Sequence, residues 1–260
     1  MSYLEVSGIT LTFRGVAALL DVSFTVEKGA IVSLIGPNGA GKTSMLNCIS
    51  GRYRPDSGKI TLGGRDLLAV PAHARTSLGL SRTFQNIALF RGLSVLDNLM
   101  AGRHARMDYG LLASILYLGK ARRSEDLHRR RVEDVIDFLG LSPYRDVPAG
   151  KLPYGVQKRV ELGRALSAES DCILLDEPMA GMNLEETEDM ARYILDINEE
   201  WGMTALLVEH DMGVVMDISK KVVVLDFGRV LAQGTPEEVM ADENVVAAYL
   251  GGEDAIFLGR

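Results

Sequence analysis

The chain has 260 residues, of which 47% are hydrophobic and 24% are charged, and its formal net charge is −7. This length and composition predict one large core or two closely joined lobes, and the acidic balance argues against a general nucleic-acid-binding protein, which would usually be basic. Cys48 and Cys172 both lie in apolar runs, which favours reduced, buried thiols in a cytosolic protein over a disulfide framework.

No membrane or secretion signal stands out. The N-terminal stretch MSYLEVSGIT carries an early glutamate and lacks the apolar region of a signal peptide. The longest membrane-like run, residues 111–118, would cover only roughly 12 Å as a helix, far less than a bilayer. We therefore expect a chain that does not span a membrane. A basic cluster at Lys120, Arg122, Arg123 and residues 129–131 is interpreted as a solvated helix face.

The N-terminal half begins with strands and turns helical. Strand-like alternation occupies residues 3–13, 22–26 and 30–36, and the third segment leads into the glycine-rich loop GPNGAGKTS. Residues 45–51 then predict a short apolar helix, and residues 58–64 a further strand. From residue 93 to about residue 140, apolar side chains recur at the spacing of one helix face.

After Leu166, strands and helices alternate. Apolar strands are predicted at 171–178, 203–210 and 220–228, with an amphipathic helix over 184–201 and a short helix after Asp211. Asn183 is the expected N-cap of the helix at 184–201. Thr235 is an expected cap as well, with Pro236 in the first helical position and Glu238 closing a capping box. Continuous apolar strands bracketed by helices predict an α/β fold with a mainly parallel sheet covered on both faces. The helical block at about 87–160 is then an insertion into this core.

The loop after the third strand matches a phosphate-binding pattern. Gly36, Gly41, Lys42 and Thr43 have the spacing G-x-x-x-x-G-K-[ST], between a strand and a helix. The glycines let backbone N–H groups surround phosphate oxygens, and the helix adds its positive N-terminal end. Lys42 would reach the β- and γ-phosphates and the Thr43 hydroxyl would bind Mg²⁺. The predicted nucleotide-binding loop comprises Gly36, Pro37, Asn38, Gly39, Ala40, Gly41, Lys42, Thr43 and Ser44.

An acidic pair supplies the second half of such a site. Asp176, at the end of an apolar strand in ILLDEP, can hold magnesium through its carboxylate. Glu177 would then point toward the γ-phosphate and polarise an attacking water. Alone, an acidic pair at a strand end is more often a solvated turn. Together with the upstream loop, it predicts a nucleotide-hydrolysing site.

Three further residues are weaker candidates. His210 ends another apolar strand and could bind the γ-phosphate and orient Glu177, or could be a satisfied turn histidine. Gln85 could contact Mg²⁺ or the water on one side and a moving lobe on the other. Phe13 could stack on a purine face or simply belong to the core.

The ordered set of Phe13, GPNGAGKT, Gln85, LPYGVQ, ILLDEP and His210 resembles the ATP-binding-cassette (ABC) ATPases over nearly the whole chain. More narrowly, RTFQNIALFRGLSVLDNL, DEPMAGMN and LLVEHDM look like the ATPase subunits of branched-chain, or hydrophobic, amino-acid uptake systems. The resemblance implies a P-loop ATPase of the ABC type, with an N-terminal antiparallel part and an inserted helical subdomain. It implies one such domain over residues 1–252 and a tail at 253–260.

For function, the resemblance implies ATP hydrolysis, with ATP and Mg²⁺ as cofactors, that powers transport. Two identical or related subunits would meet head to tail, so that Tyr154, Gly155 and Gln157 of one subunit bind the nucleotide of the other. Dimer closure would pass to two membrane permease subunits docked near residues 88–99, and indirectly to a periplasmic or extracellular solute-binding protein. The chain would then lie at the cytoplasmic side of the inner membrane as a peripheral subunit.

The sequence departs from the family pattern at its signature helix. Pro153 and Tyr154 replace the serine and first glycine of L-S-G-G-Q, Val156 stands at its glutamine, and Asn183 replaces an aspartate that helps to join the two sites. Proline is compatible with a helix start because the N–H that it lacks would be unpaired there. Gly155 permits close backbone approach, and the free N–H groups of the first turn can meet a phosphate without a hydroxyl. We interpret this segment as a working site that relies on its backbone.

Other readings stay open. A lipopolysaccharide-export ATPase is an alternative, because its tail resembles ADENVVAAYLG, and an importer could carry urea, amides or aromatic acids instead. A soluble cassette ATPase acting on DNA or ribosomes would usually carry a long coiled coil or a second cassette. A nucleotide-binding switch without hydrolysis is disfavoured by the intact Lys42, Asp176, Glu177 and His210.

Overall fold

The computed structural model describes residues 2–85, 87–106 and 120–250. The strands are β1 Ser2–Phe13, β2 Val16–Glu27, β3 Ile31–Ile35, β4 Ser57–Leu62, β5 Arg65–Asp66, β6 Leu80–Arg82, β7 Cys172–Asp176, β8 Thr204–Val208, β9 Lys221–Asp226 and β10 Arg229–Gly234. The α-helices are α1 Lys42–Ser50, α2 Ala72–Arg75, α3 Val95–Gly102, α5 Lys120–Phe138, α6 Tyr154–Leu166, α7 Leu184–Trp201, α8 Met212–Ile218, α9 Pro236–Met240 and α10 Glu243–Leu250. Short 3₁₀ turns lie at Leu67–Ala69, Thr76–Leu78, His104–Arg106, Ser142–Tyr144 and Ala149–Lys151.

The strands form two sheets. One is antiparallel, in the order β2-β1-β4-β5. The other has the order β10-β9-β3-β8-β7-β6, in which only the β10–β9 pair is antiparallel. The predicted α/β fold, with a mainly parallel core and an N-terminal antiparallel part, is therefore confirmed.

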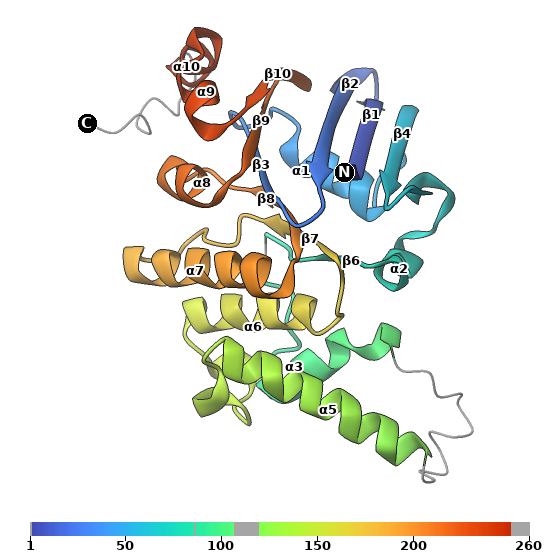
Figure 1. The fold of residues 1–260 in the computed structure, drawn as a ribbon, viewed down its shortest axis with the longest axis vertical. Helices are drawn as coiled ribbons and strands as arrows, with labels where there is room; N and C mark the ends of the chain where they lie inside the picture. The colour runs from blue at the N-terminus through green and yellow to red at the C-terminus, as the bar shows by residue number, and fades with distance from the viewer. Residues whose placement is uncertain (1, 86, 107–119, 251–260) are drawn as a thin grey trace.

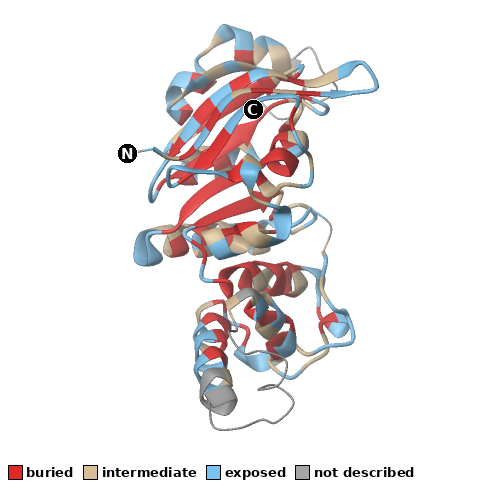
Figure 2. Cartoon of the chain, turned by 90° about the vertical axis from the view of Figure 1, so that its right-hand side faces the viewer, coloured by how far each residue is buried: buried red, intermediate tan, exposed pale blue. Residues whose placement is uncertain are grey.

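The layers follow from which faces are apolar. All five residues of β3, of β7 and of β8 are buried, as expected for strands covered on both faces. Helix α1 lies between the two sheets and shares one apolar cluster with them. Helices α6 and α7 cover the other face of the six-stranded sheet, and α3 and α5 pack beyond α6 (Figure 1). Figure 2 shows buried residues along the central sheet and between these helices.

The parallel strands bring several polar segments to one edge of the sheet. The glycine-rich loop follows β3, Asp176 ends β7, and Glu209 and His210 follow β8. Asp176 pairs with Val208 across the β7–β8 ladder, and Leu34 pairs with Val208 across β3–β8, so these strands end together. This carboxyl edge is where the predicted catalytic residues meet.

The predicted helix caps are present. The Asn183 side chain caps α7 and the Thr235 side chain caps α9, each in a complete capping box, and Asp211 caps α8. These motifs are local, so sequence spacing suffices to predict them.

The sequence reading differs from the structure at several boundaries. The second strand starts at Val16, not residue 22, and the helix after the glycine-rich loop starts at Lys42, not residue 45. Strands β5, β6 and β10 are not predicted, because β5 and β6 have two and three residues and β10 is a half-buried antiparallel edge. The apolar run at 111–118 and the tail at 253–260 lie outside the described residues. In the described ranges, no helix is long and apolar enough to cross a membrane.

Candidate active site

The glycine-rich loop depends on glycine at two points. Gly36 has φ 146°, and a Cβ there would lie 2.0 Å from the Leu225 carbonyl oxygen. Gly41 has φ 104°, and a Cβ there would lie 2.6 Å from the Ala18 carbonyl oxygen. Any other residue would collide with backbone and adopt an unfavourable conformation. The loop is thus fixed between β9 and β2.

Lys42 is held inside this loop. It is 6% exposed, and its Nζ donates to the carbonyl oxygens of Gly36 at 2.6 Å and Pro37 at 3.0 Å. Thr43 is exposed at the first turn of α1, and Ser44 is half-buried. Of the other loop residues, Asn38 and Gly39 are exposed, Pro37 is half-buried and Ala40 is buried. The ammonium and the first turn of α1 therefore face the same loop interior, as a phosphate site requires.

Asp176 is buried at the end of β7 with one oxygen paired and one free. Its Oδ2 lies 2.7 Å from Arg82 Nη2, while its Oδ1 is buried and has no hydrogen-bond partner within the described residues. Arg82 also donates to Asn47 Oδ1 at 2.8 Å and to Ser50 Oγ at 2.7 Å, both on α1. An orphaned carboxylate oxygen is costly to bury, so it points to a missing partner.

The chemistry of these residues suits a magnesium ion. Mg²⁺ prefers hard oxygen ligands, and in nucleotide sites it is bound through one or two carboxylates together with phosphates and water. Asp176 offers a buried carboxylate oxygen and Thr43 an exposed hydroxyl. No group of three His, Cys, Asp or Glu side chains among the described residues could enclose a metal alone. The donor set thus suits a metal that arrives with phosphate oxygens.

Each carboxylate oxygen of Glu177 contacts a polar side chain. His210 Nε2 lies 2.9 Å from its Oε1, and Gln85 Nε2 donates to its Oε2 at 2.8 Å. A carboxylate oxygen accepts, so His210 donates from Nε2 when this contact is a hydrogen bond to the carboxylate. Three predicted catalytic residues from separate parts of the chain therefore meet at one carboxylate, next to Asp176.

Glu209 is a functional neighbour that the sequence analysis missed. It is 4% exposed and accepts hydrogen bonds from the backbone N–H groups of Met179 at 2.9 Å and His210 at 3.0 Å. Burial raises its pKa, against the two backbone hydrogen bonds, which lower it. It ties the segment after Glu177 to the end of β8. The sequence feature that could have identified Glu209 is its position directly before His210.

The start of α6 makes its contacts away from the phosphate loop. Tyr154 is 46% exposed, and its hydroxyl donates to the Ala180 carbonyl at 3.1 Å. Gln157 Nε2 donates to the Leu152 carbonyl at 2.8 Å. Gly155 is buried, and a Cβ there would lie 2.2 Å from Glu186 Oε1. Pro153 occupies the N-cap, where no side chain caps the helix.

Phe13 lies at the tip of the β1–β2 hairpin. It is 42% exposed and meets Tyr53 edge-on, with ring centroids 5.1 Å apart. This exposure disagrees with the simple core interpretation. The same hairpin reaches the phosphate loop through Ala18, which lies against Gly41. Stacking of Phe13 on a purine stays a prediction.

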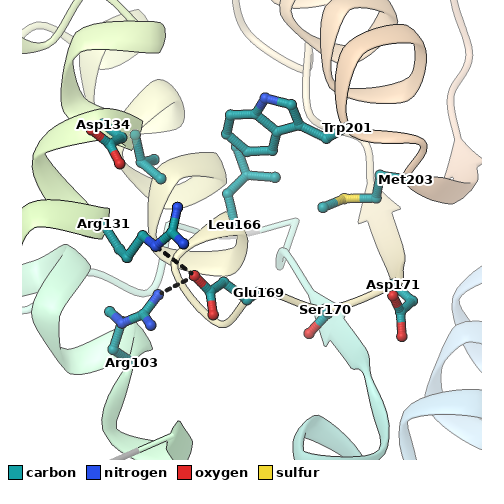
Figure 3. A pocket seen from close by; sticks show the side chains of 10 residues that line it. Arg103, Arg131, Asp134, Leu166, Glu169, Ser170, Asp171, Trp201 and Met203 are labelled. Atoms are coloured by element: carbon teal, nitrogen blue, oxygen red, sulfur yellow. Dashed lines mark ion pairs between the residues drawn. The ribbon is translucent and has the colours of Figure 1, made fainter. Parts of the chain in front are cut away.

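A separate cavity of about 360 Å³ lies at the opposite, amino edge of the sheet. It is bordered by Ser170 before β7 and Met203 before β8. Figure 3 shows Arg103 and Arg131 both directed at Glu169, at 3.1 Å and 3.7 Å from its Oε1. Burial works against ionisation of Glu169, but these arginines outweigh it and lower its pKa. None of the predicted site residues lines this cavity, so cavity size does not locate the chemistry.

With this geometry in place, comparison with known proteins assigns the family. The model of the family described as "ABC transporter" matches residues 19–180, which include the phosphate loop, Gln85, α6 and the acidic pair. The chain belongs to the ABC transporter family. A second family model, "Branched-chain amino acid ATP-binding cassette transporter", matches residues 229–255 of this ABC protein.

Curated relatives of this ABC protein cover almost the full chain. It is 40% identical to the high-affinity branched-chain amino acid transport ATP-binding protein BraF of Pseudomonas aeruginosa, over 95% of this chain and 97% of that protein. It is 37% identical to LivG of Escherichia coli, of the same description and with the same coverage. It is 34% identical to the lipopolysaccharide export system ATP-binding protein LptB of Haemophilus influenzae, over 96% of this chain and 98% of that protein.

Solved structures agree with this family. A nucleotide-free ATP-binding cassette from an ABC transporter is 30% identical, with a TM-score of 0.84, and covers 97% of this chain and 100% of that one. A cassette in its ADP conformation is 29% identical, with a TM-score of 0.83 and the same coverage. The predicted ABC-type P-loop fold is confirmed.

Proposed function

We propose that the chain is the ATP-hydrolysing subunit of an ABC importer for branched-chain or other hydrophobic amino acids. The observation that carries the enzymatic part is the Glu177 carboxylate held between His210 and Gln85, at 2.9 Å and 2.8 Å, beside the orphaned oxygen of Asp176. A structural ion pair would not need two polar side chains directed at one carboxylate next to a second carboxylate with an unpartnered oxygen.

The phosphate loop would bind the nucleotide. Residues 36–44 would supply backbone N–H groups to the phosphates, and Lys42 would exchange its carbonyl contacts for β- and γ-phosphate oxygens. Asp176, Thr43 and the Gln85 amide would hold Mg²⁺, which neutralises charge that develops on the phosphates. Phe13, exposed at the hairpin tip, would stack on the base.

Glu177 would polarise the attacking water and accept its proton. General bases of this kind contribute about 10²–10⁴-fold to the rate. His210 and Gln85 fix the orientation of the carboxylate, so no reorganisation is needed when water enters. Each chain thus carries a complete set of hydrolytic side chains.

A second ABC ATPase subunit would complete the site. The start of α6 carries no side-chain cap and presents first-turn N–H groups beside the exposed Tyr154. Tyr154, Gly155 and Gln157 would contact the γ-phosphate of the nucleotide on the partner subunit. Hydrolysis would remove that contact and release the dimer, since ATP shifts the equilibrium only through contacts made in the closed state.

Membrane partners fit the segment after Gln85. Phe84, Phe90 and Leu93 are all more than a third exposed, and exposed apolar side chains of this size favour a protein interface. Phe84 also lines, together with Ser50 and His73, a groove of about 490 Å³. Two permease subunits would dock here, linked to an external solute-binding protein. The chain would then act at the cytoplasmic face of the inner membrane.

The solute class follows from the relatives. BraF and LivG are described as branched-chain amino acid transport proteins, and the match at 229–255 has the same description. LptB has lower identity, at 34%, which makes lipopolysaccharide export the second candidate. Importers of urea, amides or aromatic acids remain within the same ATPase chemistry.

Uptake measurements test this proposal. In a strain that lacks the chain, the parental gene should restore leucine, isoleucine and valine uptake, and Glu177→Gln should not. Urea, acetamide and phenylalanine in the same assay separate the other importers. Restored outer-membrane lipopolysaccharide without restored amino-acid uptake would overturn the importer assignment in favour of export.

A further inference from the structure

Lys158 joins three segments at one buried cation. It lies in the second turn of α6 and is 3% exposed. Its Nζ donates to the backbone carbonyl of Gln85 at 3.1 Å and to the backbone carbonyl of Glu177 at 3.3 Å. One side chain thereby connects the helix that starts at Tyr154, the segment at Gln85 and the end of β7.

A cation at this depth is costly, so its retention needs a reason. Burial lowers the pKa of Lys158, although the surrounding carboxylates of Glu161, Glu209 and Glu177 raise it. The Tyr154 ring lies 5.9 Å from Nζ, so the first turn of α6 meets the same ammonium. A buried cluster of charges can often be replaced as a whole by apolar packing with little loss, although removal of one member alone is destabilising.

The same face of α6 also holds the segment after Gln85. Glu161 Oε1 accepts a hydrogen bond from the Phe84 N–H at 3.2 Å, and Arg164 donates to the Ala88 carbonyl. Residues 158, 161 and 164 are three apart and therefore share a face. The helix is expected to move together with Phe84, Gln85 and Ala88. Of the three side chains on this face, Lys158 is the one that donates a hydrogen bond to Glu177.

We propose that Lys158 is a positioning residue that couples the start of α6 to the carboxylate of Glu177. It holds the peptide carbonyl of Glu177, whose φ is 47°, and so sets the direction in which this side chain leaves the backbone. The proposal rests on the proposed function, in which the start of α6 meets the partner's nucleotide. A shift of α6 on dimer closure then reaches the hydrolytic carboxylate of the same chain through one side chain.

The test separates turnover from binding. Lys158→Met keeps the length and the packing of the stem but removes the donors. With the full-length chain, we expect kcat for ATP hydrolysis to fall about 20-fold, because small misplacement of a catalytic group costs up to about 100-fold. KM for ATP should stay within about twofold. In a Glu177→Gln background, ATP-dependent dimerisation measured by light scattering should be unchanged.

Two matched variants control for the loss of a basic side chain from α6. Arg159→Met, whose parental guanidinium donates to the Leu139 carbonyl on another side of the helix, should retain parental kcat. Lys158→Arg restores a charged donor that can serve both carbonyls and should recover kcat to within about threefold.

Several results would overturn the proposal. These are parental kcat in Lys158→Met, loss of nucleotide binding or dimerisation that matches the loss of kcat, or no recovery in Lys158→Arg. If Lys158→Met does not fold, Lys158→Gln, whose shorter side chain reaches one carbonyl, should lower kcat at least threefold, and parental kcat there would count against the role. An inactive parental protein would instead refute the ATPase function itself.

Discussion

The carboxyl edge of the sheet and the start of α6 are built in opposite ways. At the edge, Lys42, Asp176 and Glu177 each have charged or polar partners within the chain at 2.6–3.3 Å. At the start of α6, Tyr154 is 46% exposed and no side chain caps the helix. The first region has side chains that are already held in place within the chain, and the second is the surface that we propose to contact the partner subunit's nucleotide. Changes in the first should therefore alter chemistry or monomer stability, and changes in the second should alter association.

Glu177→Gln should give the largest effect, a loss of turnover without a loss of ATP binding or association. The amide keeps the shape but cannot accept a proton, so we expect kcat to fall about 10³-fold, within the range for a general base. ATP binding and ATP-dependent dimerisation should remain. Single-turnover hydrolysis and equilibrium binding of a fluorescent ATP analogue would measure both. Turnover at the parental rate would show that another group activates the water.

Arg82→Met should give the largest loss of stability at this edge. It leaves the Asp176 carboxylate, 2% exposed, without its ion-pair partner, and breaking a buried pair costs about 3–5 kcal/mol. Urea unfolding at constant m value measures this loss. Mg²⁺ with ATP should restore part of it by occupying the free carboxylate oxygen. A loss below about 1 kcal/mol would mean that the ion pair does not anchor the edge.

Gly155→Asp should act mainly on association. Added bulk and negative charge at the start of α6 should suppress ATP-dependent dimerisation at least tenfold and leave ATP binding by the monomer intact. The new side chain also meets Glu186 of the same chain, since a Cβ there lies 2.2 Å from Oε1. The double variant Gly155→Asp, Glu186→Ala removes this internal clash. Dimerisation restored in the double variant would contradict a direct contact with the partner's nucleotide.

Tyr154→Phe should give the smallest effect, and it tests whether a residue at the start of α6 contributes more to dimerisation than to stability. It removes only the hydrogen bond to the Ala180 carbonyl at 3.1 Å, on a half-exposed ring, so the free energy of unfolding should fall by no more than about 1 kcal/mol. Dimerisation should weaken about threefold, because the ring loses its anchor. Thermal unfolding and light scattering measure the two changes. If the free energy of unfolding falls by more than the free energy of dimerisation, Tyr154 contributes to monomer stability and not to association.

The residues of the site that could be predicted from the sequence are those in short contiguous motifs. The loop 36–44 and the pair Asp176 and Glu177 carry short motifs next to apolar strands, and the structure places them as the spacing implies. Lys158, Arg82 and Glu209 could not be found in this way. Apart from the contact of Glu209 with the adjacent His210, their partners lie in other segments, as with Arg82 and Asp176, which are 94 residues apart. A single basic or acidic residue on a helix or strand end usually faces solvent.

The positive φ of Glu177 has a consequence for protein engineering. A non-glycine residue at φ 47° stores about 1–2 kcal/mol of backbone strain, which the hydrogen bond from its N–H to the Val208 carbonyl at 2.9 Å helps to sustain. Glycine would relieve that strain. A library screened only for heat resistance could therefore enrich Glu177→Gly and discard the water-polarising carboxylate. At position 177, selection for thermal stability favours glycine, whereas selection for ATP turnover favours glutamate.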